Sequence, residues 1–142
     1  LLGGTANAVA PRKRMLSSMT PTIVRRDGEP VLVAGGVGGS RIITAVLQVI
    51  INVIDHEMNA QEAVNFPRMH HQWLPDQLET EPGVSPDTIA LLEGMGHRVK
   101  QRVSSGSLTG AIALHAQADP ARGEYRLEGA PDPRREASAA GY

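Results

Sequence analysis

The sequence predicts an α+β fold in a single domain, residues 1–142, in which antiparallel sheet packs against helices. The chain has 142 residues, which is enough for one hydrophobic core. Short β-favouring segments separated by turn residues lie near both ends of the chain, and a long apolar stripe at helical spacing lies between them. The sequence has no internal repeat, so these elements are expected to form one unit.

A hairpin and a buried helix come first. Residues 22–26 and 30–34 favour strands, and Asp27-Gly28 between them is a strong turn signal. A glycine turn, Gly-Gly-Val-Gly-Gly-Ser-Arg, follows at residues 35–41. From Ser40 to about Glu57 the apolar residues fall at positions 42, 43, 46, 47, 49, 50, 53 and 54. A stripe this wide predicts a helix with most of its surface buried.

Two shorter helices and several strands follow. Asn59, with Glu62 three residues later, forms a capping box, and Pro67 limits the helix that begins there. Ser85-Pro86-Asp87 supplies an N-cap, a proline at the first helical position and an acid in the first turn of a third helix, which a glycine at 94 or 96 ends. Extended chain is predicted at 68–74, 98–103, 110–116 and 124–128.

Composition excludes several classes of partner. The formal net charge is −1, which gives no electrostatic case for binding nucleic acid or an anionic membrane. The longest apolar run, residues 42–54, is interrupted by polar residues and too short to cross a bilayer. The basic cluster Arg12-Lys13-Arg14 fits a solvated loop. The absence of cysteine excludes disulfides, thiolate metal sites and cysteine nucleophiles.

The sequence lacks the residues that common cofactor, metal and nucleophile motifs require at fixed spacings. The glycine turn lacks the lysine of a phosphate-binding loop and the third glycine of a dinucleotide site. His56-Glu57 begins like a zinc protease helix, but Ala60 stands where the second histidine is needed. His70 and His71 are adjacent and face opposite sides of a strand, so they do not readily bind one metal ion together; a site that combines either one with His97 or His115 is the alternative. No Gly-x-Ser-x-Gly elbow occurs. We therefore predict no cofactor and no metal.

The glycine turn has two interpretations. It joins a strand to the N-terminus of the buried helix, where backbone N–H groups and the helix dipole favour an oxyanion. Alternatively, the glycines only permit positive φ and close packing, and taken alone this is the more common case. Ser17 and Ser18 are likewise either carboxylate-binding hydroxyls or an ordinary polar turn before Pro21.

A resemblance to a known family bears on this choice. The similar segments, in order, are Leu16-Ser17-Ser18-Met19-Thr20-Pro21-Thr22-Ile23-Val24, Asp27-Gly28, Gly38-Gly39-Ser40-Arg41-Ile42-Ile43, Asn65-x-Pro67-Arg68-x-His70-His71-Gln72-Trp73-Leu74-Pro75, Ser85-Pro86-Asp87-Thr88, Asp132-Pro133-Arg134 and Ala140-Gly141-Tyr142. In order and spacing they resemble the small-subunit core of γ-glutamyltranspeptidases. The similarity extends over nearly the whole chain, which makes it far more specific than any one glycine motif.

The resemblance implies a fold and a chemistry. Members of this family are N-terminal-nucleophile hydrolases, αββα sandwiches made as a precursor that cleaves itself into a large and a small subunit. The new N-terminal threonine of the small subunit attacks a γ-glutamyl amide, typically glutathione, and water or an amine resolves the acyl-enzyme. The resemblance implies that Gly38 and Gly39 supply the oxyanion hole. It implies that Ser17 and Ser18 hold the α-carboxylate of the substrate.

Departures from the family pattern limit these expectations. The chain starts downstream of the position of the nucleophilic threonine, and the large-subunit arginine that pairs with the substrate carboxylate is absent. Thr5 is internal and stands where relatives often carry an acidic residue, so it does not replace the nucleophilic threonine. Val37 stands where many bacterial relatives have proline. We therefore expect residues 1–142 alone to be inactive, with incompletely covered apolar faces that favour self-association.

The expected partners are the large subunit and the N-terminal part of the small subunit of the same precursor, together with glutathione or another γ-glutamyl compound. Relatives imply a periplasmic or secreted location. Two alternatives stay open. One is a non-catalytic anion-binding module, and the other is a family relative that acts on glutaryl or poly-γ-glutamyl substrates.

Overall fold

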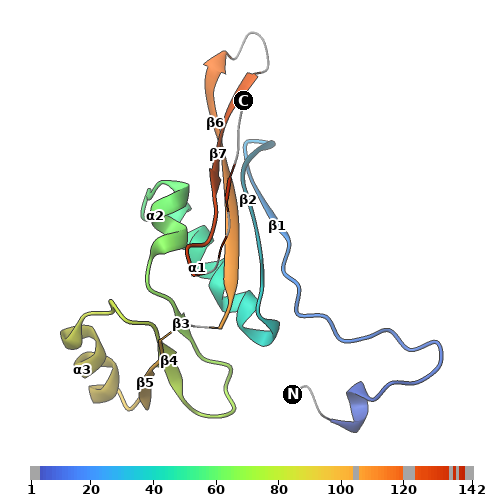
Figure 1. The fold of residues 1–142 in the computed structure, drawn as a ribbon, viewed down its shortest axis with the longest axis vertical. Helices are drawn as coiled ribbons and strands as arrows, with labels where there is room; N and C mark the ends of the chain where they lie inside the picture. Colours follow the sequence, from blue (N-terminus) through green and yellow to red (C-terminus); the bar gives the residue numbers. More distant parts are fainter. Residues whose placement is uncertain (1–3, 104–105, 120–123, 135, 137, 140–142) are drawn as a thin grey trace.

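The computed structural model describes residues 4–103, 106–119, 124–134, 136 and 138–139. Its main sheet has the strand order β1-β2-β6-β7, and all neighbours are antiparallel (Figure 1). The strands are β1 (Thr22–Arg26), β2 (Glu29–Val37), β6 (Leu108–Asp119) and β7 (Glu124–Ala130). Asp27 and Gly28 join β1 to β2 with φ values of 52° and 89°, the left-handed geometry that two-residue hairpin turns require. This confirms the predicted hairpin.

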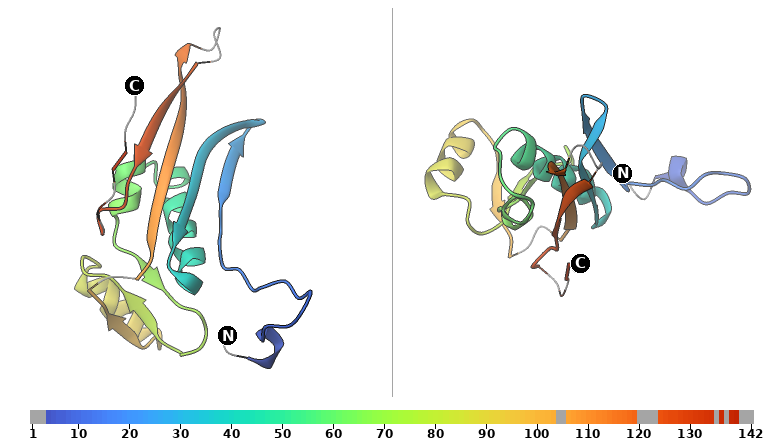
Figure 2. Two further views of the ribbon diagram at one scale, coloured as in Figure 1. Left: turned by 45° about the vertical axis from the view of Figure 1, so that its right-hand side comes forward. Right: turned by 90° about the horizontal axis from the view of Figure 1, so that it is seen from above.

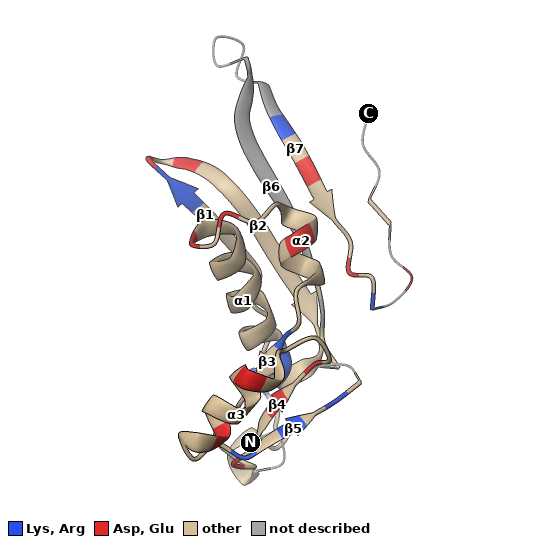
Figure 3. Cartoon of the chain, turned by 90° about the vertical axis from the view of Figure 1, so that its left-hand side faces the viewer, with Lys and Arg blue, Asp and Glu red and all other residues tan. Residues whose placement is uncertain are grey.

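Two helices cover one face of this sheet. Figure 3 shows α1 (Ile42–Ile54) and α2 (Ala60–Asn65) in front of the strands. The core between helices and sheet contains Leu32, Val46, Val49, Val64, Ala111 and Ala130, all buried. The capping box at Asn59 is formed, since Glu62 N donates to Asn59 Oδ1 at 2.8 Å and Asn59 N donates to Glu62 Oε2 at 3.2 Å. None of the described helices is long and apolar enough to cross a bilayer.

A second, smaller sheet lies at the end of the main sheet where α1 begins (Figures 1 and 3). It contains β3 (Met69–His70), β4 (Leu78–Thr80) and β5 (Val99–Gln101). The helix α3 (Pro86–Gly94) connects β4 to β5, which are parallel, while β3 is antiparallel to β4. Ser85 caps α3 and Pro86 occupies its first turn, as predicted.

Residues 4–21 form an arm that leaves the body of the molecule (Figure 2). Its one regular element is the short 3₁₀ helix η1 (Thr5–Asn7), which has no buried residue. The arm joins β1 at the end of the sheet where β2 finishes, because Thr22 pairs with Ala34.

The structure corrects several predicted boundaries. The strand predicted to end at Ala34 continues to Val37, because Gly35 and Gly36 pair with Gly110 and Thr109 on β6. Only Met69–His70 of the segment 68–74 is a strand, and the chain then loops through a cis Leu74–Pro75 bond. The parallel β4–β5 pair departs from the antiparallel expectation, since α3 supplies the crossover that parallel strands need. Ala140-Gly141-Tyr142 lie outside the described residues.

Candidate functional site

The candidate site centres on the tight turn at Gly38 and Gly39, between the end of β2 and the start of α1. Gly38 has φ of 139° and Gly39 has φ of 62°, conformations that side chains rarely adopt. A Cβ atom on Gly38 would lie 2.6 Å from Ser107 Cα and 2.9 Å from the Gly106 carbonyl oxygen. The short helix η2 (Gly39–Arg41) then leads directly into α1. Glycine at 38 is therefore required both by its conformation and by the close approach of the 106–107 backbone.

The residues after the turn are anchored to the small sheet. Ser40 Oγ donates to Gln72 Oε1 at 2.7 Å. Arg41 donates to Glu79 Oε2 from Nε at 3.1 Å and from Nη2 at 2.6 Å, and Arg102 Nη1 donates to Glu79 Oε1 at 2.6 Å. Burial alone would raise the pKa of Glu79, but the hydrogen bonds and charges of the two arginines hold this pKa below its ordinary value. Glu79 is thus a fixed anionic anchor for Arg41.

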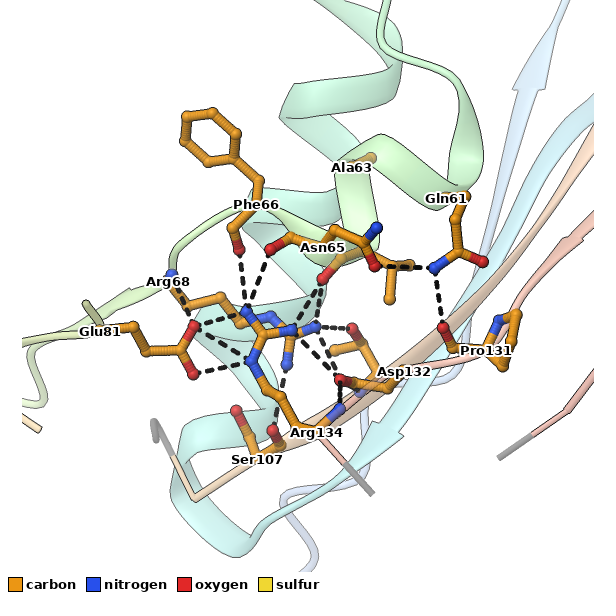
Figure 4. A network of polar contacts seen from close by, with 12 residues as sticks. Gln61, Ala63, Asn65, Phe66, Arg68, Glu81, Ser107, Pro131, Asp132 and Arg134 are labelled. Carbon is orange, nitrogen blue, oxygen red and sulfur yellow. Dashed lines mark hydrogen bonds and ion pairs between the residues drawn. The ribbon is translucent and has the colours of Figure 1, made fainter. Parts of the chain in front are cut away.

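A buried ion cluster holds the segment that packs against Gly38 (Figure 4). Arg68 donates to the Ser107 carbonyl from Nη1 at 3.0 Å and to Thr109 Oγ1 from Nη2 at 2.6 Å. The same guanidinium pairs with Asp132 at 2.8 Å, and the two side chains are only 2% and 3% exposed. The cluster therefore fixes the start of β6 beneath the turn.

Glu81 and Arg134 complete this cluster. Arg134 Nη2 pairs with Glu81 at 2.5 Å, and Arg134 Nη1 pairs with Asp132 at 3.1 Å. Burial alone would raise the pKa of Asp132, but backbone N–H groups of Thr109 and Arg134 and the charge of Arg68 hold that pKa below its ordinary value. Burial, together with the nearby charge of Arg134, lowers the pKa of Arg68.

Ser17 and Ser18 make only local hydrogen bonds within the part of the chain that the structure describes. Met19 N donates to Ser17 Oγ at 3.3 Å, and Thr20 Oγ1 donates to the Ser18 carbonyl at 3.0 Å. Ser17 is exposed and Ser18 is half-buried. Because Thr22 pairs with Ala34, residues just before β1 and just after β2 emerge at the same end of the sheet. The segment that carries the two serines thus joins the sheet at the end where the glycine turn lies, and the described hydrogen bonds of the serines do not reach that turn.

The histidines divide into a buried and a surface group. His70 is 6% exposed and contacts Thr44 and Gln72. His71 lies edge-on to His97, with ring centroids 6.5 Å apart, and its Nε2 is 3.3 Å from Asp76 Oδ1. Among the described residues, no three potential metal-ligating side chains gather. The side chain of His115 lies outside the described residues.

Sequence reasoning assigned no role to several residues that support the turn, namely Arg68, Gln72, Glu79 and Asp132. The contacts that support the turn join residues from 32 positions apart, Ser40 and Gln72, to 64 positions apart, Arg68 and Asp132, and such contacts leave no periodic signal. The only available signal was that Arg68, Gln72 and Asp132 fall inside segments that carry the family resemblance.

Comparison with known proteins identifies the family. The Gamma-glutamyltranspeptidase family model matches residues 3–142. The chain belongs to the γ-glutamyltranspeptidase family. It is 53% identical over 134 residues to the Glutathione hydrolase proenzyme of Escherichia coli, covering 94% of this chain and 22% of that relative. The corresponding Pseudomonas sp. (strain A14) proenzyme is 45% identical, with 100% of this chain and 25% of the relative covered.

Solved γ-glutamyltranspeptidases share this α+β fold. The T380A mutant from Helicobacter pylori superposes with a TM-score of 0.85 at 45% identity, covering 95% of this chain and 70% of that one. The enzyme from Pseudomonas nitroreducens complexed with L-DON gives a TM-score of 0.82 at 36% identity, covering 100% and 71%. The chain spans about a quarter of the length of the two curated relatives above.

Proposed function

We propose that this chain forms part of the active site of an enzyme that hydrolyses or transfers γ-glutamyl groups, from glutathione and related γ-glutamyl amides. Family membership over residues 3–142 is the observation that carries this proposal. The relatives from E. coli and Pseudomonas are named glutathione hydrolase proenzymes. Because the chain spans about a quarter of their length, the other catalytic groups come from the remaining segments of the same precursor.

In this proposal the glycine turn stabilises the oxyanion. A threonine at the N-terminus of the small subunit, outside this chain, adds its hydroxyl oxygen to the γ-carbonyl carbon, and the carbonyl oxygen becomes negatively charged. The N–H groups of Gly38 and Gly39 donate to that oxygen. The leaving amine departs with a proton, and water or a second amine then attacks the threonine ester. The positive φ of both glycines and the nearby start of α1 support this assignment.

Ser17 and Ser18 hold the α-carboxylate of the γ-glutamyl group in the same proposal. Their hydroxyl groups are accessible donors, and the hairpin register brings their segment to the end of the sheet that carries the glycine turn. A hydroxyl that donates to a carboxylate forms a charge-assisted hydrogen bond. The serines therefore select substrates that carry a free carboxylate at the distance of a glutamyl side chain from the reacting carbonyl.

Acyl transfer through a threonine ester needs no cofactor. The proposed partners are the large subunit and the N-terminal part of the small subunit of the same precursor. The proposed location of the enzyme is the periplasm or the extracellular medium. Glutaryl and poly-γ-glutamyl groups are the competing acyl substrates.

The experiment is γ-glutamyl-p-nitroanilide turnover by the full-length protein that contains this chain. We expect turnover, and we expect the Ser17→Ala/Ser18→Ala double variant to raise KM about tenfold or more, because two hydrogen bonds to a charged group are lost. Thr5→Ala is the matched control and should change neither kcat nor KM. Absence of turnover, together with glutamate binding by residues 1–142 alone in calorimetry, would replace this proposal by the anion-binding module.

A further inference from the structure

A chain of side-chain hydrogen bonds runs from the glycine turn into the contact between α1 and the small sheet. Ser40 follows Gly39 directly, and its Oγ donates to Gln72 Oε1 at 2.7 Å. Gln72 Nε2 donates to the Leu74 carbonyl at 3.0 Å. A carbonyl oxygen only accepts, so the amide nitrogen of Gln72 faces Leu74 and its oxygen faces Ser40. The orientation of the Gln72 amide is therefore fixed.

His70 extends this series of hydrogen bonds from Gln72 back to α1. Its Nε2 lies 3.1 Å from Gln72 Oε1, and because that oxygen only accepts, Nε2 carries a proton and donates. Its Nδ1 lies 2.7 Å from Thr44 Oγ1. Thr44 Oγ1 and Nδ1 are thus within hydrogen-bonding distance, and the tautomer of the ring sets which of the two donates. At 6% exposure the ring is held in one place.

These hydrogen bonds form a closed ring with the backbone of residues 40–44. Ser40 lies in η2 and Thr44 lies one helical turn later in the first turn of α1, while His70 belongs to β3 and Gln72 to the loop after it. Thr44 Oγ1 also lies 3.2 Å from the Arg41 carbonyl oxygen, inside the same helical turn. This ring of contacts ties the direction of η2 to the small sheet. A rotation of η2 would change the direction in which the N–H groups of Gly38 and Gly39 point. Small misalignments of catalytic donors lower the reaction rate.

Resting on the proposed function, we infer that Gln72 and His70 are positioning residues that hold the Gly38–Gly39 turn in its catalytic geometry through Ser40. They act through Ser40 rather than on the substrate. Two side chains of the small sheet, which the proposed function leaves without a role, thereby affect catalysis. We expect their loss to weaken stabilisation of the transition state while substrate binding is kept.

The test compares four variants of the full-length protein: Ser40→Ala, Gln72→Leu, their double variant and Gln48→Leu. Gln48 is the matched control, because it also joins α1 to β3 through two hydrogen bonds, to Met69 O at 2.7 Å and from Met69 N at 2.8 Å, without reaching the turn. The values of kcat and KM for γ-glutamyl-p-nitroanilide are measured per mole of cleaved chain. We expect kcat to fall roughly tenfold in Ser40→Ala and in Gln72→Leu with KM within twofold, since full loss of an oxyanion donor costs about 10²-fold or more.

The double variant tests whether Ser40 and Gln72 affect kcat through the same contact. We expect its kcat to match that of the single variants, because both remove the same contact, and we expect Gln48→Leu to stay within twofold of the unmodified protein. Additive losses, a loss confined to KM, or an equal loss in Gln48→Leu would overturn the inference and leave the proposed function intact. No turnover by the unmodified protein would overturn both.

Folding failure of Gln72→Leu would not end the test. Ser40→Ala removes only one hydroxyl group from a half-buried side chain. If only this variant is cleaved and soluble, a kcat loss of at least fivefold at unchanged KM supports the inference, and a kcat within twofold of the unmodified value overturns it. His70→Gln then serves as a partial rescue, because its amide nitrogen can replace Nε2 as the donor to Gln72 and should retain more kcat than His70→Leu.

Discussion

Gly38 is the residue at which conformation and packing restrict the side chain most severely. Its φ of 139° disfavours any side chain, and a Cβ atom would meet the Ser107 Cα at 2.6 Å. Because the obstacle is backbone, it cannot rotate away. We expect Gly38→Ala to lower the free energy of unfolding by about 1–3 kcal/mol and to reduce kcat of the full-length protein. Urea unfolding followed by circular dichroism measures the first effect.

Gly35→Ala is the control for Gly38→Ala. Nothing lies within 4 Å of a Cβ atom built at Gly35, and its φ lies outside the range that excludes side chains. We expect its unfolding midpoint to equal or exceed that of the unmodified chain, since glycine weakens the interior of a strand. Equal destabilisation by both substitutions would show that the Ser107 contact is not what restricts position 38.

Asp132 is a buried carboxylate on which the stability of the site depends. Asp132→Asn would leave the Arg68 guanidinium without its ion-pair partner, and breaking a buried pair costs on the order of 3–5 kcal/mol. Because the pKa of Asp132 is lower in the folded chain, its ionisation stabilises the fold above the unfolded pKa of about 4. This contribution is lost as the pH falls through the folded pKa.

Urea unfolding between pH 7 and pH 3 tests this account of Asp132. The unmodified chain should lose stability steeply below about pH 4. Asp132→Asn should show a shallower slope there, and Glu79, whose pKa is also lowered, should still contribute to it. Asp76→Asn is the matched control, because the Asp76 side chain is 74% exposed. An exposed pair of this kind contributes little, so the control should leave both stability and slope unchanged.

At the scale of elements, α3 depends on its cap more than on its packing. It contains no buried residue, whereas Ala60, Ala63 and Val64 of α2 are all buried. Ser85 Oγ accepts from Thr88 N at 3.3 Å. Ser85→Ala should therefore cost about 1 kcal/mol, which corresponds to roughly fivefold faster amide exchange in α3 without a change in the global unfolding midpoint.

Asn59→Ala is the comparison for Ser85→Ala. Loss of the α2 cap should lower the global midpoint by an amount that corresponds to about 1 kcal/mol, because α2 is part of the core. Hydrogen exchange and urea unfolding on both variants distinguish local from global effects. A global loss for Ser85→Ala as large as that for Asn59→Ala would contradict the independence of α3.

Elements with local signals were predictable, and those that depend on distant partners were not. The Asn59 capping box and the Ser85-Pro86 start were placed correctly, since capping needs only neighbours in sequence. The extension of β2 through Gly35 was missed, because only pairing with β6 makes a strand of those glycines. In the candidate site, the sequence predicted a glycine turn, and Gly38 and Gly39 do adopt positive φ, but their role as an oxyanion hole stays a prediction. The contacts of Gln72 and Arg68 could be found only in the structure.

At the scale of the molecule, the two faces of the main sheet differ. The helices α1 and α2 pack against Leu32 and Ala111 on one face. On the other face Ile23 pairs with Val33, and the register of β6 with β7 puts Leu127 on that same face. Ile23 is 64% exposed, Val33 is 37% exposed and Leu127 is 63% exposed. The 142-residue chain by itself thus presents an apolar sheet face to water, as expected for part of a sandwich of two sheets.

This face predicts how residues 1–142 behave as a separate polypeptide. We expect self-association that increases with concentration, because burial of apolar surface between copies replaces the missing layer. Ile23→Thr/Leu127→Thr keeps strand-compatible residues and should shift the light-scattering mass toward the 15.1 kDa monomer. Leu91→Thr, at a 65% exposed site on α3, is the control and should leave association unchanged. The prediction would be contradicted if the unmodified chain is monomeric and binds no dye that reports exposed apolar surface. Such a result would mean that the apolar sheet face is covered in solution.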